Sequence, residues 1–115
     1  MKYSIYTSCF NIEKNNFNYW QETIPRWIKF IKEGECGEIV IAVNKSEDKT
    51  LEIIKDNFNK FNFISIVETD FEYEDYAFDG KIKNAALQNT KNNICLGLDL
   101  DEYPSPNEIA WEKYQ

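Results

Sequence analysis

A short apolar run that ends in acidic residues is the feature that most constrains this chain. Residues 94–98 (ICLGL) hold four apolar side chains and no charge, and Asp99, Asp101 and Glu102 follow directly. A run of this length and composition predicts a strand that is buried on both faces, as in the middle of an α/β sheet. Such a strand would carry three carboxylates to one edge of the sheet.

The Asp-x-Asp pair predicts a divalent metal site. Neighbouring carboxylates repel one another, and a bound cation removes that repulsion. One or two carboxylates can hold Mg²⁺ or Mn²⁺ and leave its other positions to water and phosphate oxygens. We therefore interpret Asp99 and Asp101 as candidate metal ligands. The alternative interpretation is a polar strand end, where aspartate is favoured because it stabilises the following turn.

Apolar periodicity predicts the remaining elements. Strand-like patterns cover residues 3–9, 38–43 and 63–67, and helical spacing covers residues 20–31, 51–61 and 81–90. A further short helix is predicted over residues 107–114. Between the third strand and the third helix, residues 68–79 form a long loop rich in acidic and aromatic side chains.

Helix boundaries follow from proline, glycine and capping residues. Pro25 predicts either that the first helix begins near Thr23, with the proline in its first turn, or that the helix is kinked. The two glycines that follow, Gly34 and Gly37, are predicted to end it. The N-cap of the second helix is predicted at Ser46 or Asp48.

The alternation of strands and helices predicts the fold class. At 115 residues the chain is a single domain. We expect a Rossmann-like three-layer α/β sandwich with a mostly parallel sheet of about four strands. Ligands of such sheets bind beyond the carboxyl ends of the strands. The polar and aromatic side chains at those ends are Ser8, Phe10, Asn11, Asn44, Asp99 and Asp101.

Composition excludes several classes of function. The net charge of −7 argues against binding to nucleic acid or to an anionic membrane. The chain has no histidine, so histidine-based catalytic triads and zinc sites are excluded. Its three cysteines lack metal-ligand spacing, and we interpret them as reduced core thiols of a cytoplasmic protein. No apolar run is long enough for a transmembrane segment.

These side chains together predict a site for a nucleoside diphosphate that carries a group on its β-phosphate. A metal at the aspartates would offset the charge of the diphosphate. The start of the third helix, with Lys81 and Lys83, would add positive potential. Phe10 can stack on a nucleobase, and Asn44 can form a hydrogen bond with the edge of the base.

Four segments in this order resemble the nucleotide-binding half of the family 2 glycosyltransferases, which have the GT-A fold. Residues 7–13 are similar to the first strand end of that family, and residues 43–50 to its Asp-Asp-Gly-Ser turn. Residues 80–87 are similar to its Gly-x-x-x-Arg-Asn helix start, and residues 98–102 to its Leu-Asp-Ala-Asp-Glu strand end. The resemblance covers nearly the whole chain.

The resemblance implies a role for each matched residue. Ser8 and Phe10 would lie against the base, and Asn44 would contact its edge. Asp101 would be the main ligand of Mn²⁺ or Mg²⁺, and Asp99 would approach the ribose or the metal. The matched residues of the nucleotide-sugar site also include Asn11, Asn84 and Lys83, which stands near the diphosphate in place of the usual arginine. The implied substrates are a nucleotide-sugar donor with a hexose-type sugar and a glycan or other acceptor.

The chain departs from the family pattern at two places. The acidic pair of the second turn is Val43 and Asn44, and the glycine of that turn is Lys45, which implies a different nucleotide. The family places its catalytic base and acceptor site well beyond the Asp-x-Asp motif, whereas 14 residues follow Asp101 here. We therefore assign no catalytic residue and expect a donor-binding domain that is truncated after the motif.

Two alternatives belong to other classes of protein. A non-catalytic nucleotide- and metal-binding or interaction module would bind without turnover. The face that a missing C-terminal half would cover would then promote self-association. A phosphatase of the haloacid dehalogenase type also ends a strand in Asp-x-Asp, but it carries that motif on its first strand and not on its last.

Overall fold

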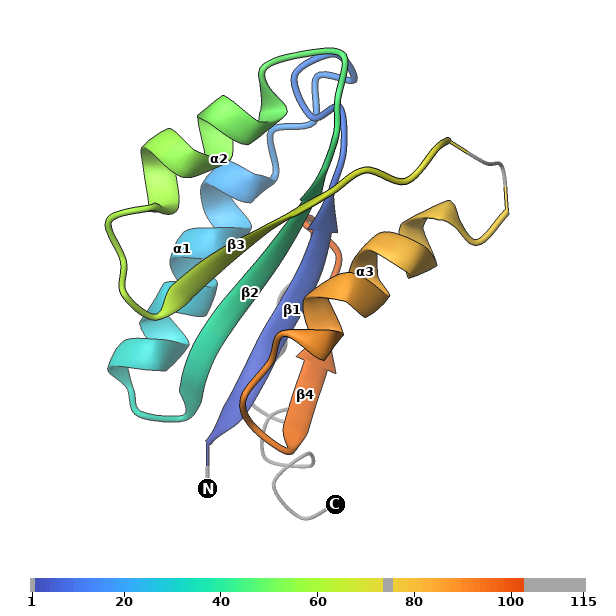
Figure 1. Ribbon diagram of the computed structural model, residues 1–115. Coiled ribbons are helices and arrows are strands. Elements are labelled where there is room, and N and C mark those ends of the chain that lie inside the picture. The colour runs from blue at the N-terminus through green and yellow to red at the C-terminus, as the bar shows by residue number, and fades with distance from the viewer. Residues whose placement is uncertain (1, 74–75, 103–115) are drawn as a thin grey trace.

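The sequence folds into alternating strands and helices, as its periodicity predicts (Figure 1). The structure, a computed structural model, describes residues 2–73 and 76–102. In chain order the elements are β1 (Tyr3–Cys9), α1 (Trp20–Lys32), β2 (Cys36–Asn44), α2 (Thr50–Phe58), β3 (Ile64–Thr69), α3 (Phe78–Gln88) and β4 (Ile94–Gly97). The helix predicted over residues 107–114 lies outside the described residues.

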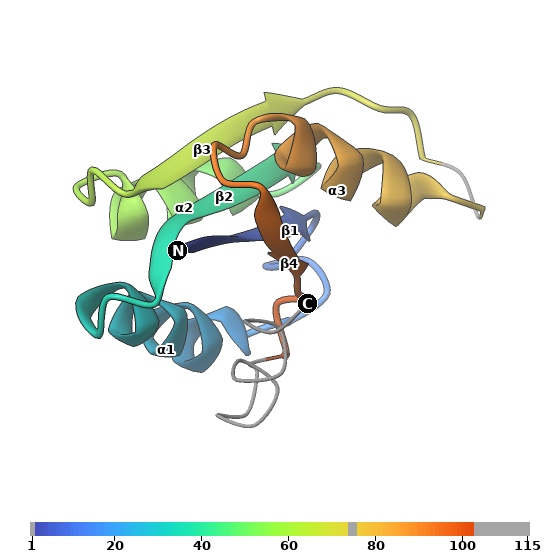
Figure 2. The same ribbon diagram turned by 90° about the horizontal axis from the view of Figure 1, so that it is seen from below.

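The strands form one parallel sheet with the order β3-β2-β1-β4. Strand side chains alternate between the two faces, so β2 contributes to two separate apolar clusters. Ile39 and Ile41 pack with α1 and α2, whereas Val40 and Ala42 pack with α3. Figure 2 shows α1 and α3 on opposite sides of the sheet. The predicted three-layer α/β fold is therefore confirmed.

Helix α1 begins at Trp20, as the spacing over residues 20–31 predicted, so of the two alternatives for Pro25 the start near Thr23 was wrong. Pro25 lies inside the helix, where the missing N–H and the ring cost about 3 kcal/mol. Its side chain points to solvent, while Ile24 and Trp27 are fully buried against the sheet. Each buried side chain contributes about 1.5–3 kcal/mol, and this burial outweighs the cost of the proline.

The other helix boundaries shift by a few residues. Gly34 ends α1 with a positive φ of 85°, as predicted, but Gly37 lies within β2. Helix α2 stops at Phe58, so the prediction that it reaches Phe61 was wrong; the Phe61 N–H bonds to the Phe58 carbonyl in a turn.

The N-cap position of α2 is Lys49, one residue after the predicted Asp48. Asp48 nevertheless accepts the N–H of Thr50 at 3.0 Å. The aspartate therefore still satisfies one of the backbone donors that the first helical turn leaves without a partner.

Helix α3 begins at Phe78 and ends at Gln88, whereas residues 81–90 were predicted. Ala77 precedes it with φ of 64°, a left-handed conformation that costs a non-glycine residue about 1–2 kcal/mol. Gly80 thus lies within the first turn and not before it. Because the helix starts earlier, it includes both Asp79 and Lys83. Side chains four residues apart in a helix lie on the same side and can contact each other.

Strand β4 is half-buried, so the prediction of a strand covered on both faces was wrong. Within the described part of the chain it pairs with β1 alone and stands at the edge of the sheet. A short apolar run has the same appearance in the sequence whether one or two strands flank it.

Residues 2–73 and 76–102 contain no helix with the length and apolarity needed to cross a bilayer.

A buried carboxylate fixes the connection between α3 and β4. Glu38 is 7% exposed, and its Oε2 atom accepts the Ser4 hydroxyl at 2.7 Å and the backbone N–H of Lys91. The side chain of Asn92 donates in turn to Ser4 at 3.0 Å. These bonds hold the chain at the point where it enters β4, and so they help to position the acidic residues at the other end of that strand.

The buried thiols predict a loss of stability at high pH. Burial raises the pKa of Cys9 to about 12, with a smaller contribution from the charge of Asp48, and burial raises the pKa of Cys36 to about 11. An unfolded thiol has a pKa of about 8.5. The stability that these protonated thiols contribute is therefore complete below about pH 8.5 and is lost as the pH rises towards 11–12.

Urea unfolding at pH 8 and pH 10 measures this effect. Each thiol is expected to lower the free energy of unfolding by about 1.4 kcal/mol per pH unit above about pH 8.5. The double variant Cys9→Ala/Cys36→Ala should show a smaller loss between the two pH values. An equal loss in the variant and the wild type would contradict the prediction.

Candidate functional site

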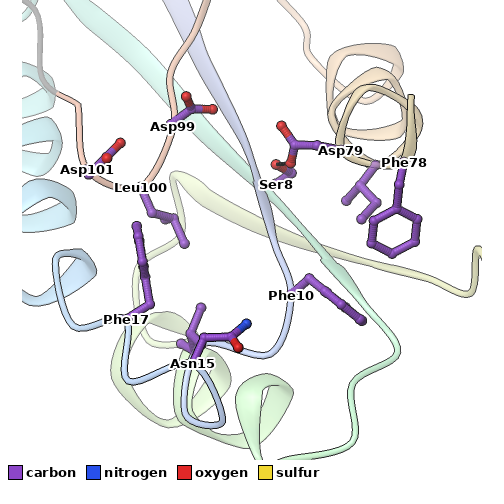
Figure 3. A pocket seen from close by; sticks show the side chains of 11 residues that line it. Ser8, Phe10, Asn15, Phe17, Phe78, Asp79, Asp99, Leu100 and Asp101 are labelled. Carbon is purple, nitrogen blue, oxygen red and sulfur yellow. Dashed lines mark hydrogen bonds between the residues drawn. The ribbon is translucent and has the colours of Figure 1, made fainter. Parts of the chain in front are cut away.

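A cavity of about 400 Å³ opens at the carboxyl end of the sheet (Figure 3). It lies between the end of β1, the start of α3 and the loop that follows β4. One part of its wall, called the aromatic wall below, carries the rings of Phe10 and Phe78, and another part carries carboxylates. The lining residues are Ser8, Phe10, Ile12, Asn15, Phe17, Phe78, Asp79, Ile82, Asp99, Leu100 and Asp101.

The loop after β4 gathers three carboxylates. Asp99, Asp101 and Glu102 are exposed, and one oxygen atom from each lies within 4.8 Å of the others. The loop closes on itself, because the Asp99 N–H donates to Glu102 Oε1 at 2.8 Å and the Glu102 N–H donates to the Asp99 carbonyl at 3.0 Å. Clustered carboxylate oxygens are the ligands that Mg²⁺ and Mn²⁺ prefer. The donor set therefore fits the predicted metal.

Two side chains of helix α1 form hydrogen bonds to the backbone of this carboxylate loop, residues 99–102. Leu98 and Leu100 are buried on either side of Asp99. The Thr23 hydroxyl donates to the Leu100 carbonyl at 2.6 Å, and Trp27 Nε1 donates to the Glu102 carbonyl at 3.0 Å. Both donors come from a helix that is itself packed on the sheet. The carboxylates are thus exposed while the backbone that carries them is held.

Lys83 lies beside the carboxylate loop. Its ammonium group forms an ion pair with Asp99 and lies 3.6 Å from Asp79, one turn earlier on α3. Partial burial by itself lowers the pKa of Lys83. The hydrogen bond and charge of Asp99, with those of Asp79, outweigh this effect and raise the pKa overall. Lys83 therefore stays charged next to the candidate metal ligands.

Asp79 is a cavity residue that the sequence did not predict. The Ser8 hydroxyl donates to Asp79 Oδ1, while Asp79 Oδ2 faces Lys83. The signal that would have revealed it is the four-residue spacing to Lys83. That signal has meaning only if the helix already includes residue 79, and the predicted helix started two residues later.

Three aromatic rings meet at the other side of the cavity. The ring of Phe10 lies 4.9 Å from Phe78 in an edge-to-face arrangement. Tyr73 lies nearly parallel to Phe10 at 6.4 Å and 5.3 Å from Phe78. Such ring pairs contribute about 0.5–1.5 kcal/mol beyond their buried area. They fix the segment after β3 against the end of β1 and leave Phe10 half-buried on the cavity wall.

Asn44 is buried away from this cavity and holds the segment after β3. Its Oδ1 atom accepts the Thr69 hydroxyl at 2.7 Å and the Phe71 N–H at 2.8 Å, and its Nδ2 atom donates to the Phe71 carbonyl at 2.9 Å. Its side chain is 2% exposed. Contact with a base stays a prediction and would require these bonds to be exchanged.

Asn11 has a similar place. It adopts a positive φ of 48°, its N–H donates to Ser46 Oγ, and its side chain accepts the Glu47 N–H, each at 3.0 Å. It therefore joins the end of β1 to the loop before α2. Asn84 is exposed on α3. Of the residues predicted for the site, Ser8, Phe10, Asp99 and Asp101 line one cavity, Lys83 contacts Asp99, and the three asparagines lie outside it.

Comparison with known proteins supports a relation to sugar-transferring enzymes. No family model matches the sequence. A curated protein of Methanococcus voltae, dolichyl N-acetyl-alpha-D-glucosaminyl phosphate 3-beta-D-2,3-diacetamido-2,3-dideoxy-beta-D-glucuronosyltransferase, is 38% identical over 84 residues. The match covers 71% of this chain and 25% of that protein. By its name, this relative transfers a sugar.

Two solved structures share the fold. The crystal structure of S. aureus TarS matches with a TM-score of 0.65 and 27% identity, over 88% of this chain and 17% of TarS. The crystal structure of TarS 1-349 gives the same score and identity over 90% of this chain and 28% of its own length. The chain is a glycosyltransferase-like domain with the GT-A fold.

The resemblance to family 2 glycosyltransferases is thus confirmed, and so is the predicted fold. This glycosyltransferase-like domain spans about a quarter of the length of the curated relative. Its carboxylate loop, Lys83 and the aromatic wall lie at the carboxyl ends of the strands, where parallel α/β sheets bind their ligands.

Proposed function

We propose that the cavity binds a nucleotide-diphosphate sugar through Mn²⁺ or Mg²⁺, for transfer of a hexose-type sugar to a glycan or other acceptor. One observation carries the proposal: the carboxylate loop and an aromatic wall line the same cavity. A metal site and a ring-binding surface are what a nucleoside diphosphate requires at its two ends. The similarity to a glucuronosyltransferase supports a sugar as the group that is carried.

The metal would be held by Asp101 and Asp99, with Glu102 as a third oxygen donor within reach. Bound there, the ion supplies positive charge that offsets the diphosphate leaving group. In a chain with a net charge of −7, such a cation would supply the positive charge that favours a phosphorylated ligand. Lys83, held at the edge of the loop, adds a second positive charge close to the same place.

The aromatic wall would hold the base. Phe10 is fixed by its contacts with Phe78 and Tyr73, so it can offer a ring face without first being ordered. Stacking of a base on an aromatic side chain contributes about 1–3 kcal/mol. Ser8 lies between this wall and the carboxylates, at the end of β1.

Calorimetry with UDP and GDP, each with and without Mn²⁺, tests the proposal. Wild type should bind at least one of them more tightly with the metal. Loss of an outer-sphere partner of a metal site typically costs 10–100-fold, so loss of the main ligand in Asp101→Ala should cost about 100-fold or more. Asp56→Ala is the matched control, because Asp56 is an exposed aspartate on α2.

Binding that needs no metal and is unchanged in Asp101→Ala would refute the metal role. Release of UDP or GDP from the corresponding nucleotide sugars measures turnover. Metal-dependent binding with turnover indicates a transferase. Metal-dependent binding without turnover is expected both for the donor-binding part of a transferase and for the non-catalytic module. We assign no catalytic base among the described residues, and we propose that the chain corresponds to the donor-binding part of such an enzyme.

A further inference from the structure

Lys83 joins two carboxylates from different parts of the chain. Its ammonium group contacts Oδ1 of Asp99, on the loop after β4, and lies 3.6 Å from Oδ2 of Asp79. The lysine side chain is 24% exposed, against 51% for Asp99 and 66% for Asp79. Lys83 is therefore the most buried member of this group, and both carboxylates are within its reach.

A hydrogen bond from Ser8 holds Asp79 in position to pair with Lys83. Ser8, at the end of β1, donates to one oxygen of Asp79, and the other oxygen faces Lys83. Ser8 is buried, with an exposed fraction of 8%. This hydrogen bond ties Asp79 to the sheet, so the position of its second oxygen does not depend on the carboxylate loop.

A divalent cation and Lys83 compete for Asp99. The Asp99 carboxylate is a candidate metal ligand, and the ammonium group already occupies its Oδ1 atom. A divalent ion and an ammonium group about 4 Å apart repel one another strongly enough to change an affinity about thirtyfold in water and more in a partly buried site. We therefore expect metal binding through Asp99 to push Lys83 away from that carboxylate.

We propose that Lys83 is an internal counter-ion that the metal displaces from Asp99, and that Asp79 is the positioning residue that takes it over. This inference rests on the proposed metal site. In the metal-free protein the lysine neutralises part of the carboxylate loop. When the metal binds, Lys83 shifts to Asp79 and stays at the edge of the cavity.

Titration of the full chain with Mn²⁺ alone tests this exchange, with free Mn²⁺ measured by electron paramagnetic resonance. Lys83→Met should raise the affinity for Mn²⁺ about tenfold, because the competitor is gone. Asp79→Asn keeps an acceptor for Ser8 but removes the charge that receives Lys83. It should lower the affinity about threefold.

The double variant separates the exchange from a simple change of charge. If Asp79 acts through Lys83, most of the effect of Asp79→Asn disappears in the Lys83→Met background. A plain loss of negative charge would act equally in both backgrounds. Lys55→Met is the matched control, because it removes a lysine from the exposed ion pair with Glu68 and should leave the Mn²⁺ affinity unchanged.

The outcomes distinguish this inference from the proposed function. Mn²⁺ binding that depends on Asp101 but is unchanged or weakened in both Lys83→Met and Lys83→Gln would overturn the exchange alone. An equal effect of Asp79→Asn in both backgrounds would overturn the role of Asp79. Absence of Asp101-dependent Mn²⁺ binding in every variant would overturn the metal site and the exchange together.

Discussion

Trp27→Ala is expected to lower the free energy of unfolding by about 3–5 kcal/mol, a large part of the stability of a domain of this size. Trp27 is fully buried in the apolar cluster between α1 and the sheet. Its removal leaves a cavity and also takes away the donor to the Glu102 carbonyl. Urea unfolding followed by far-ultraviolet circular dichroism measures the loss.

Trp27→Phe separates packing from positioning. The phenyl ring keeps most of the apolar contact but cannot donate to Glu102, so we expect a smaller loss of stability, about 1–2 kcal/mol. Binding of Mn²⁺ should weaken as well, because the carboxylate loop loses one of its two bonds to α1. Trp20→Phe, on the same helix, should change stability and leave Mn²⁺ binding intact. Equal Mn²⁺ affinities in wild type and Trp27→Phe would contradict the positioning role.

Asn44→Asp is expected to destabilise the fold by about 3 kcal/mol at pH 7, although it restores the carboxylate of the related family. Asn44 donates to the Phe71 carbonyl at 2.9 Å. A carboxylate would place an acceptor against that carbonyl, and a buried polar group without a partner costs about 1–3 kcal/mol, more when it is charged. The amide at this position therefore serves the segment after β3.

The pH dependence of Asn44→Asp identifies the cause. Burial and the facing carbonyl should raise the pKa of the new carboxyl above its unfolded value of about 3.9. The penalty is then complete above the folded pKa and disappears as the pH falls towards 3.9, where the protonated acid can donate to Phe71. Unfolding at pH 4 and pH 7, compared with wild type, measures this recovery. Asn44→Ala should show no such recovery, and equal stability of Asn44→Asp and wild type at pH 7 would refute the role.

Local patterns were sufficient to predict the fold. Residues 39–43 of strand β2 are all apolar, so the strand had to be covered on both faces, and it is. Helix α1 repeats large apolar side chains at helical spacing, and burial of that face keeps the helix intact around Pro25. Such signals lie within a few residues of the chain and need no knowledge of its neighbours.

The parts that escaped prediction depend on contacts between distant residues. Whether β4 is central or at an edge depends on which strands flank it, and its own four residues carry no record of this. The orientation of Asn44 is decided by Phe71, 27 residues later. Ser8 finds its partner Asp79 at a separation of 71 residues. A sequence pattern can place a polar residue at a strand end, but it cannot show which partner its side chain will meet.

The apolar and acidic residues that follow β4 affect the register in which this strand pairs with β1. Leu98 directly follows β4, donates its N–H to the Tyr6 carbonyl and is buried, whereas the next residue, Asp99, is exposed. Sliding β4 by a single residue along β1 would exchange these two positions. Leu98 would be exposed, and the Asp99 carboxylate would enter the core, at a cost of several kcal/mol. A strand register that misplaces Asp99 therefore also disrupts the core, so the same residues that form the candidate metal site favour the native register.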